Sequence, residues 1–234
     1  MERAPTGIQG LDELIEGGFP RNASVLVTGT PGTAKTTLAL QFLVNGILKH
    51  NENGLYFGPG VYLNEVAAQF GRYGYDLKKL QDEGRLIMLA PKVKVEEGED
   101  YVKTLFDENL KKKIVDSNVK RIVIDSITLI LMFAGEFGGR RRNVERIIEY
   151  LKDLGVTSIL IQEKHVGGKE EIEYGMEEFV VDGIMYMQLI RIGNIFRRAI
   201  TILKMKGTKH SMDIHPVMLE EGGIKVYSRD RIYQ

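Results

Sequence analysis

The fold predicted for this chain depends on one stretch near its N-terminus, Val25-Leu26-Val27-Thr28-Gly29-Thr30-Pro31-Gly32-Thr33-Ala34-Lys35-Thr36-Thr37. The apolar run at its start indicates a buried strand, and the glycines that follow allow the backbone to turn sharply and to point N–H groups at an anion. A helix expected over residues 35–49 directs its N-terminal amides and the positive end of its dipole at the same place. The stretch therefore predicts a phosphate-binding loop.

The pattern G-x-x-x-x-G-K-[ST] gives this loop specific roles. Lys35 supplies a point charge for the β- and γ-phosphates, and the Thr36 hydroxyl is a ligand for Mg²⁺. Ala34 stands where the pattern has glycine; its methyl costs little at negative φ and weakens binding at positive φ. The alternative is an ordinary glycine-rich turn that happens to end in Lys-Thr. The predicted nucleotide-binding residues here are Gly29, Thr30, Pro31, Gly32, Thr33, Ala34, Lys35, Thr36 and Thr37.

Composition narrows the class of protein. The chain has 234 residues, which fits a single domain over residues 1–234. Lys plus Arg and Asp plus Glu both number 32, so no overall charge favours nucleic acid. Cysteine is absent, and the four histidines lack metal-ligand spacing, so we expect no zinc site. No apolar run is long enough to span a membrane and residues 1–9 do not resemble a signal peptide, so we expect a cytoplasmic protein.

Hydrophobic periodicity predicts an α/β fold for the rest of the chain. Helices are expected over residues 6–15, 35–49, 64–70, 76–83, 99–115 and 143–154, and strands over 25–28, 54–57, 85–89, 121–126 and 156–162. Two later pairs of β-type runs, 184–192 with 195–206 and 216–219 with 224–227, predict hairpins. We therefore expect a sheet that is mostly parallel, flanked by helices, with antiparallel C-terminal strands. A mobile loop is expected over residues 166–178.

Asp125 ends the buried apolar run of residues 121–124. An acid in this position, after a phosphate loop, is where such proteins place the aspartate that acts on Mg²⁺. The alternative is a structural aspartate at the end of an ordinary buried strand. The predicted metal ligands are therefore Thr36 and Asp125.

Several stretches together resemble the KaiC group of RecA-type P-loop ATPases. They are residues 6–14 with 17–20 before the loop, 74–77 with 82–86, 124–126, 173–180 with Asp182, and 204–211. The resemblance spans nearly the whole chain. It implies a RecA-like core that binds ATP or ADP with Mg²⁺, and a homo-oligomer, for which a hexameric ring is one form, with nucleotide between subunits.

The resemblance also implies roles for residues near the C-terminus. In the family pattern K-[LM]-R-G-T-x-H, the Lys and the Arg reach the γ-phosphate of a neighbouring subunit, and these positions are Lys204 and Lys206 here. Lysine in place of arginine keeps the charge but loses the planar fork of donors. Thr208 and His210 occupy positions that help to hold the nucleotide.

One departure from the family concerns catalysis. Members usually carry a Glu-Glu pair after the second strand, one of which polarises the attacking water, and here those positions are Gly60 and Val61. Neither side chain can accept a proton. Glu65 is the nearest downstream acid, but a surface or capping role suits its place in a helix better. With Lys35 and Asp125 as the remaining catalytic candidates, we expect hydrolysis to be slow.

Three functions remain open on the sequence. The first is an ATP-binding switch or assembly scaffold with slow or absent hydrolysis. The second is an active oligomeric ATPase of the recombinase-paralogue type on single-stranded DNA, which Arg140, Arg141 and Arg142 would favour if they faced a central channel; an exposed start of a helix is the alternative for these residues. The third is a P-loop domain that has lost nucleotide, against which the intact loop and Asp125 argue. The sequence names no protein partner.

Overall fold

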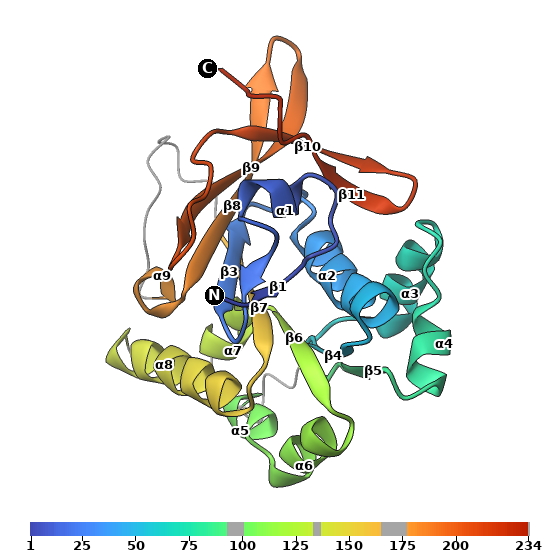
Figure 1. Ribbon diagram of the computed structural model, residues 1–234. Helices are drawn as coiled ribbons and strands as arrows, with labels where there is room; N and C mark the ends of the chain where they lie inside the picture. Colours follow the sequence, from blue (N-terminus) through green and yellow to red (C-terminus); the bar gives the residue numbers. More distant parts are fainter. Residues whose placement is uncertain (93–100, 133–136, 165–176, 234) are drawn as a thin grey trace.

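A central sheet of nine strands organises the computed structural model, which describes residues 1–92, 101–132, 137–164 and 177–233 (Figure 1). Its order is β11-β10-β9-β8-β3-β7-β6-β4-β5. The strands are β3 (Ser24–Gly29), β4 (Asn53–Phe57), β5 (Leu86–Leu89), β6 (Val119–Asp125), β7 (Thr157–Glu163), β8 (Gly183–Ile192), β9 (Ile195–Met205), β10 (His215–Glu220) and β11 (Gly223–Val226). Pairing is parallel from β8 to β5 and antiparallel from β8 to β11, which confirms the predicted sheet.

Helices cover both faces of the sheet and divide the core into two apolar clusters. One face packs against α1 (Leu11–Leu14), α2 (Lys35–His50), α3 (Leu63–Gly71) and α4 (Leu77–Asp82). The other face packs against α5 (Tyr101–Leu105), α6 (Glu108–Asp116), α7 (Ile127–Met132) and α8 (Phe137–Asp153), while α9 (Glu177–Val180) precedes β8 (Figure 1). Strands β3 and β6 are almost entirely buried because both of their faces are covered.

Several predicted elements need correction. The helix expected over residues 6–15 covers only Leu11–Leu14. The helix expected over residues 99–115 is broken into α5 and α6, because the side chain of Asp107 accepts hydrogen bonds from the N–H groups of Asn109 and Leu110 and so starts a new helix. The short strands β1 (Arg3–Ala4) and β2 (Phe19–Pro20) and helix α7 were not expected.

Arg140, Arg141 and Arg142 lie in α8, which begins at Phe137, several residues before the predicted start at residue 143. Most of the loop expected over residues 166–178 lies outside the described residues. In the described part of the chain, no helix combines the length and apolar character needed to cross a bilayer.

A buried ion pair joins the start of β6 to the end of α2. Arg121 is fully buried, and its Nε donates to Oε2 of Glu52 at 2.6 Å while its Nη1 donates to the carbonyl of Phe42 at 2.9 Å. The guanidinium also lies 4.5 Å from the ring centroid of Phe42. A Cβ at Gly46 would lie 2.3 Å from Nε of Arg121, so this helix position must be glycine for the arginine to enter. The pair anchors α2, the helix that carries the phosphate loop, on the sheet.

Candidate functional site

The loop between β3 and α2 has the backbone of an anion-binding turn. Gly29 has a φ of 149°, and a Cβ there would lie 1.9 Å from the carbonyl oxygen of Met187 on β8, so only glycine allows β3 to pass this close. Gly32 has a φ of 81°, and a Cβ there would meet no atom within 4 Å. The loop at Gly32 therefore borders open space, as the approach of a phosphate group requires.

Ala34 adopts the conformation that the sequence left undecided. Its φ of 74° and ψ of 30° are left-handed, and the residue is the N-cap of α2. This conformation costs a residue with a side chain about 1–2 kcal/mol, whereas glycine adopts it without that cost. The methyl group at this position is therefore unfavourable for the loop.

Lys35 folds back into its own loop. Its Nζ donates to the carbonyl oxygens of Gly29 at 2.9 Å and Thr30 at 2.8 Å, and the residue is only 7% exposed. Burial lowers the pKa of Lys35, and the negative charges of Glu163 and Asp125 oppose this effect. A buried ammonium held at the centre of the loop is placed to exchange a carbonyl partner for a phosphate oxygen.

Asp125 lies directly beside the start of α2. Its Oδ2 accepts hydrogen bonds from Oγ1 of Thr36 at 2.7 Å and from the phenol of Tyr56 at 2.9 Å. Burial raises the pKa of Asp125, the two hydrogen bonds lower it, and the charge of Glu163 raises it further. A hydroxyl beside a carboxylate is the oxygen donor set that Mg²⁺ prefers, so these two residues fit the ion that was predicted for them.

Lys204 and Lys206 lie at the opposite end of the sheet from the phosphate loop. Between β3 and β8, Gly29 pairs with Met187 and Val25 pairs with Gly183. Between β8 and β9, Gly183 pairs with Met205. Lys204 pairs with Ile184, the partner of Leu26, so at about 3.3 Å per residue Lys204 is displaced by roughly 10 Å and Lys206 by roughly 16 Å along the strands from Gly29. Within one chain these lysines are remote from the loop that follows β3.

Lys204, Lys206, Thr208 and His210 each make contacts with nearby residues. Nζ of Lys204 donates to the carbonyl of Glu178 at 3.1 Å, and Nζ of Lys206 donates to Oδ1 of Asp182 at 3.0 Å. Burial lowers the pKa of Lys204, and the neighbouring charge of Lys206 lowers it further. The hydroxyl of Thr208 accepts a hydrogen bond from Arg3, and His210 lies within hydrogen-bond distance of the carbonyl of Ser211. None of these contacts involves a residue of the phosphate loop.

The positions of the missing acids form a turn after β4. Gly60 has a φ of 74°, and its N–H donates to the carbonyl of Pro91 at 2.9 Å. Val61 is half-buried against the apolar cluster on the α2 face. Glu65 is exposed in the first turn of α3. The described turn over residues 58–62 therefore carries no acidic residue.

Comparison with known proteins identifies the family. A family model described as "ATPase: KaiC" matches residues 4–231. The chain belongs to the KaiC family of ATPases. A KaiC-like protein of the hyperthermophilic archaeon Pyrococcus horikoshii has a similar crystal structure, with a TM-score of 0.83, 32% identity, and coverage of 97% of this chain and 99% of that one.

Two cyanobacterial clock proteins are also similar to this KaiC-family chain. The circadian clock oscillator protein KaiC of Nostoc sp. is 34% identical over 232 residues, which are 97% of this chain and 44% of the relative. The protein of the same name from Synechococcus elongatus is 32% identical over 227 residues, which are 95% of this chain and 43% of the relative. The chain thus spans less than half the length of these relatives. Family membership confirms the RecA-like P-loop resemblance and implies nucleotide binding.

Three residues near the KaiC-family phosphate loop were not singled out from the sequence. Tyr56 reaches Asp125 from β4, Glu163 ends β7, and Nε of Arg198 on β9 donates to the carbonyl of Gly32 at 2.9 Å. Glu163 carries a sequence signal that was available, since it follows a buried apolar strand as Asp125 does. Tyr56 and Arg198 lie within strands and carry no such signal, because only the pairing of the sheet brings them to the loop.

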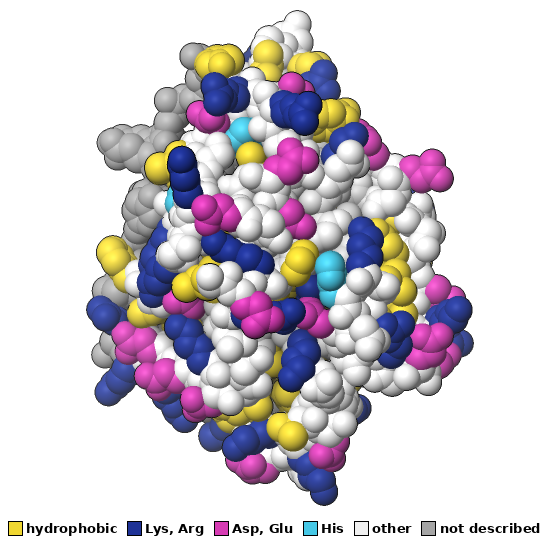
Figure 2. Space-filling view, viewed as in Figure 1, with side chains coloured by type: hydrophobic (Ala, Val, Ile, Leu, Met, Phe, Trp, Pro, Cys, Tyr) yellow, Lys and Arg dark blue, Asp and Glu magenta, His cyan; other side chains and the backbone are white. Residues whose placement is uncertain are grey.

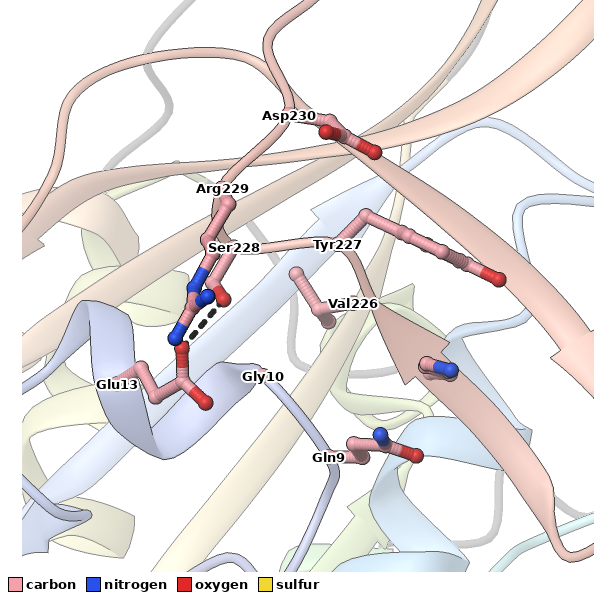
Figure 3. Close-up of a pocket in the computed structure, with 9 residues that line it drawn as sticks. Gln9, Gly10, Glu13, Val226, Tyr227, Ser228, Arg229 and Asp230 are labelled. Carbon is pink, nitrogen blue, oxygen red and sulfur yellow. Dashed lines mark hydrogen bonds between the residues drawn. The ribbon is translucent and has the colours of Figure 1, made fainter.

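A separate pocket lies between the segment around α1 and the chain that follows β11 (Figure 3). Figure 3 shows the hydrogen bond that joins the two segments there, in which Oγ of Ser228 donates to Oε2 of Glu13 at 2.6 Å. No residue of the phosphate loop lines this pocket. It is therefore distinct from the candidate nucleotide site.

Proposed function

We propose that the protein binds ATP or ADP together with Mg²⁺ and acts as a nucleotide-dependent switch or assembly scaffold that hydrolyses ATP slowly. One observation carries the proposal. Lys35 is centred in the loop and Thr36 is bonded to Asp125, an arrangement that supports nucleotide binding, while the turn at Gly60 and Val61 carries no acid. Binding and hydrolysis depend on different groups, so the first can persist where the second is weak.

Each loop residue has a defined part in binding. The N–H groups at the start of α2 face the phosphates, Lys35 places its charge on the β- and γ-phosphate oxygens, and Thr36 and Asp125 would hold the metal ion. Mg²⁺ held by these two residues would neutralise charge on the phosphates. Burial of Lys35 and Asp125 strengthens these interactions, because charges interact more strongly away from water.

Slow hydrolysis follows from the turn after β4. A positioned general base is worth roughly 10²–10⁴-fold in rate, which is about 3–5 kcal/mol of barrier. Gly60 and Val61 cannot accept a proton, and Glu65 is exposed on a different element. Tight binding with slow turnover suits a switch, since the bound nucleotide then sets the state of the protein for a long time.

Assembly into a homo-oligomer, such as a ring, is part of the proposal. Along the strands, Lys204 lies roughly 10 Å and Lys206 roughly 16 Å from the loop of their own chain, so they would reach a phosphate only in a neighbouring copy. Head-to-tail contacts of this kind close into rings when the rotation between copies allows it. Nucleotide occupancy would then control whether subunits associate, and thereby which surface meets a protein partner.

A DNA-dependent ATPase is the second candidate function. Arg141 and Arg142 are exposed near the start of α8, which favours contact with a phosphate backbone. Arg141, however, pairs with Glu145 at 2.8 Å, and the face shown in Figure 2 has cations and acids interspersed. Fluorescence anisotropy with a labelled single-stranded oligonucleotide separates the two candidates. Binding that is lost on replacing both arginines by alanine would favour the second.

The central test measures binding and turnover on one preparation. Calorimetric titration should detect ATP and ADP binding that depends on Mg²⁺, and hydrolysis should be far below the usual range of about 1–10³ s⁻¹. Lys35→Ala should weaken ATP binding by at least about tenfold, because hydrogen bonds to charged groups are worth about 1.5–3 kcal/mol. Lys49→Ala, at the exposed end of the same helix, is the matched control. Unchanged affinity in Lys35→Ala would refute the nucleotide site, and ordinary enzymatic turnover would refute the slow switch.

A further inference from the structure

We propose that Glu163 is the catalytic base of this site, whose carboxylate orients the water that attacks the γ-phosphate and accepts a proton from it. The inference rests on the proposed function: it assigns the slow residual hydrolysis to a carboxylate on another strand, outside the turn after β4 where the usual family base is replaced by Gly60 and Val61. In this step the water oxygen bonds to the γ-phosphorus, and the bond from phosphorus to the β–γ bridging oxygen breaks. The bond electrons leave with ADP, and the proton of the water passes to Glu163.

The register of the sheet places Glu163 at the phosphate loop. Glu163 is the register partner of Gly29, the first residue of the loop, on the adjacent parallel strand. On the other side of β7, Asp125 is the partner of Ile161, two residues before Glu163. Strands β3, β7 and β6 are consecutive in the sheet, so their carboxyl ends bring the loop, Glu163 and Asp125 to one edge.

Alternation along β7 sends the Glu163 side chain toward α2. Ile159 and Ile161 belong to the apolar cluster on the α2 face, whereas Leu160 belongs to the cluster on the opposite face. Because successive side chains of a strand point to opposite faces, Glu163 continues the row of Ile159 and Ile161. On β6, Asp125 follows Val123 by two residues, and Val123 also belongs to the cluster on the α2 face. The hydrogen bond from Thr36 on α2 to Asp125 shows that side chains in this row point toward α2. The two carboxylates therefore share the face that carries the phosphate loop.

The backbone around Glu163 is held on both sides. Its N–H donates to Oγ1 of Thr128 on α7 at 2.9 Å, and the N–H of the next residue, Lys164, donates to the carbonyl of Gly29 at 3.1 Å. The side chain is exposed, and within the described residues its carboxylate has no hydrogen-bond or ion-pair partner. A general base needs a fixed backbone and a carboxylate that is available to accept a hydrogen bond from the attacking water.

The charge of Glu163 acts on the two groups that define the site. Burial lowers the pKa of Lys35 and raises that of Asp125, and in both cases the negative charge of Glu163 raises the pKa. This agrees with the register of the sheet, which places Glu163 level with Gly29 and two residues beyond Ile161, the partner of Asp125. Glu65, the acid first considered for this role, has neither relationship in the structure.

Single-turnover hydrolysis of pre-bound Mg²⁺-ATP, run beside calorimetric titration, tests the inference. Glu163→Gln keeps the size of the side chain and removes its basicity, so the rate should fall by about 10²-fold or more. The Kd for ATP should stay within about threefold, because the group acts on the transition state rather than on binding. Glu163→Asp should retain part of the rate. Glu65→Gln and Glu149→Gln, both exposed acids on helices, should hydrolyse like the native protein.

Each contrary outcome has a separate meaning. A native rate in Glu163→Gln would overturn the inference, as would equal losses of rate and affinity, which point to a role in binding alone. Absence of any hydrolysis by a native protein that binds Mg²⁺-ATP would overturn the inference and leave the proposed switch intact. A native protein that fails to bind Mg²⁺-ATP would overturn both.

Discussion

The phenol of Tyr56 donates a hydrogen bond of 2.9 Å to Oδ2 of Asp125, the same oxygen that accepts from Thr36. Tyr56 is fully buried on β4, next to β6, and its ring lies among the apolar side chains of the α2 face. Burial, followed by the charge of Asp125, raises the pKa of Tyr56, so the phenol remains a donor. The proposed metal ligand is thus oriented by a residue within the core.

Replacing Tyr56 by phenylalanine should test this support. Tyr56→Phe removes a hydrogen bond to a charged group, which is worth about 1.5–3 kcal/mol, so the free energy of unfolding should fall by a similar amount. The Mg²⁺ concentration needed for ATP binding should rise, because Asp125 loses an orienting contact. Urea unfolding and titration with Mg²⁺ measure the two effects. Tyr62→Phe, at a residue 74% exposed, is the control, and equal behaviour of both variants would contradict the prediction.

Ala34→Gly should improve the loop. The left-handed backbone costs alanine about 1–2 kcal/mol, and glycine avoids this cost. Glycine, however, loses roughly 0.5–1 kcal/mol of stability because its unfolded chain is more flexible. The free energy of unfolding should therefore stay the same or rise by up to about 1 kcal/mol, and ATP should bind more tightly. Ala39→Gly, inside α2, should instead lose about 1 kcal/mol. Thermal unfolding with and without ATP measures both, and a loss of stability at residue 34 would show that its methyl makes useful contacts.

Lys204→Ala should loosen any oligomer that forms with Mg²⁺-ATP while the separate chains remain folded. Without the ammonium, a phosphate bound to the neighbouring chain loses a charged partner. Light scattering with and without Mg²⁺-ATP measures the molar mass, and circular dichroism verifies folding. Lys152→Ala, which removes a nearby lysine that pairs with Asp182, is the control for general effects on this region. A native protein that stays monomeric under both conditions would contradict the proposed assembly.

Asp182 should contribute stability that depends on pH. Burial alone would raise its pKa, but hydrogen bonds from the N–H of Ser24 and from Lys152 and Lys206 lower it below the usual value of 3.8. A carboxylate with a lowered pKa stabilises the folded state above the unfolded-state pKa, and this contribution is lost as the pH falls through the folded-state value. Asp182→Asn should therefore cost about 1–3 kcal/mol at pH 7.

Urea unfolding of the native protein and Asp182→Asn between about pH 7 and pH 3 measures this dependence. The difference between the two proteins should be constant at neutral pH and should shrink only below about pH 4. Asp153→Asn is a matched control, because Asp153 is an exposed acid at the end of α8. A difference that does not change with pH would mean that Asp182 acts through its shape rather than its charge.

Local signals in the sequence predicted much of this protein. The buried run from Val25 and the glycines after it specify the strand, the loop and the start of α2, and Gly193-Asn194 marks the hairpin between β8 and β9. These predictions succeeded because turns, helix starts and hydrophobic periodicity depend on neighbouring residues. The break at Asp107 was missed because the apolar stripe continues across it, although aspartate is a common N-cap.

The sequence by itself determined the phosphate loop, the family, and the absence of acids at Gly60 and Val61, since each of these is written in consecutive residues. Only the tertiary structure decided which strand ends meet. It placed Tyr56 and Thr36 on one oxygen of Asp125, set Glu163 beside Gly29, and put Lys204 at the far end of the sheet. The physical reason is that strand order and register arise from packing over the whole sheet, which brings together residues far apart in the chain.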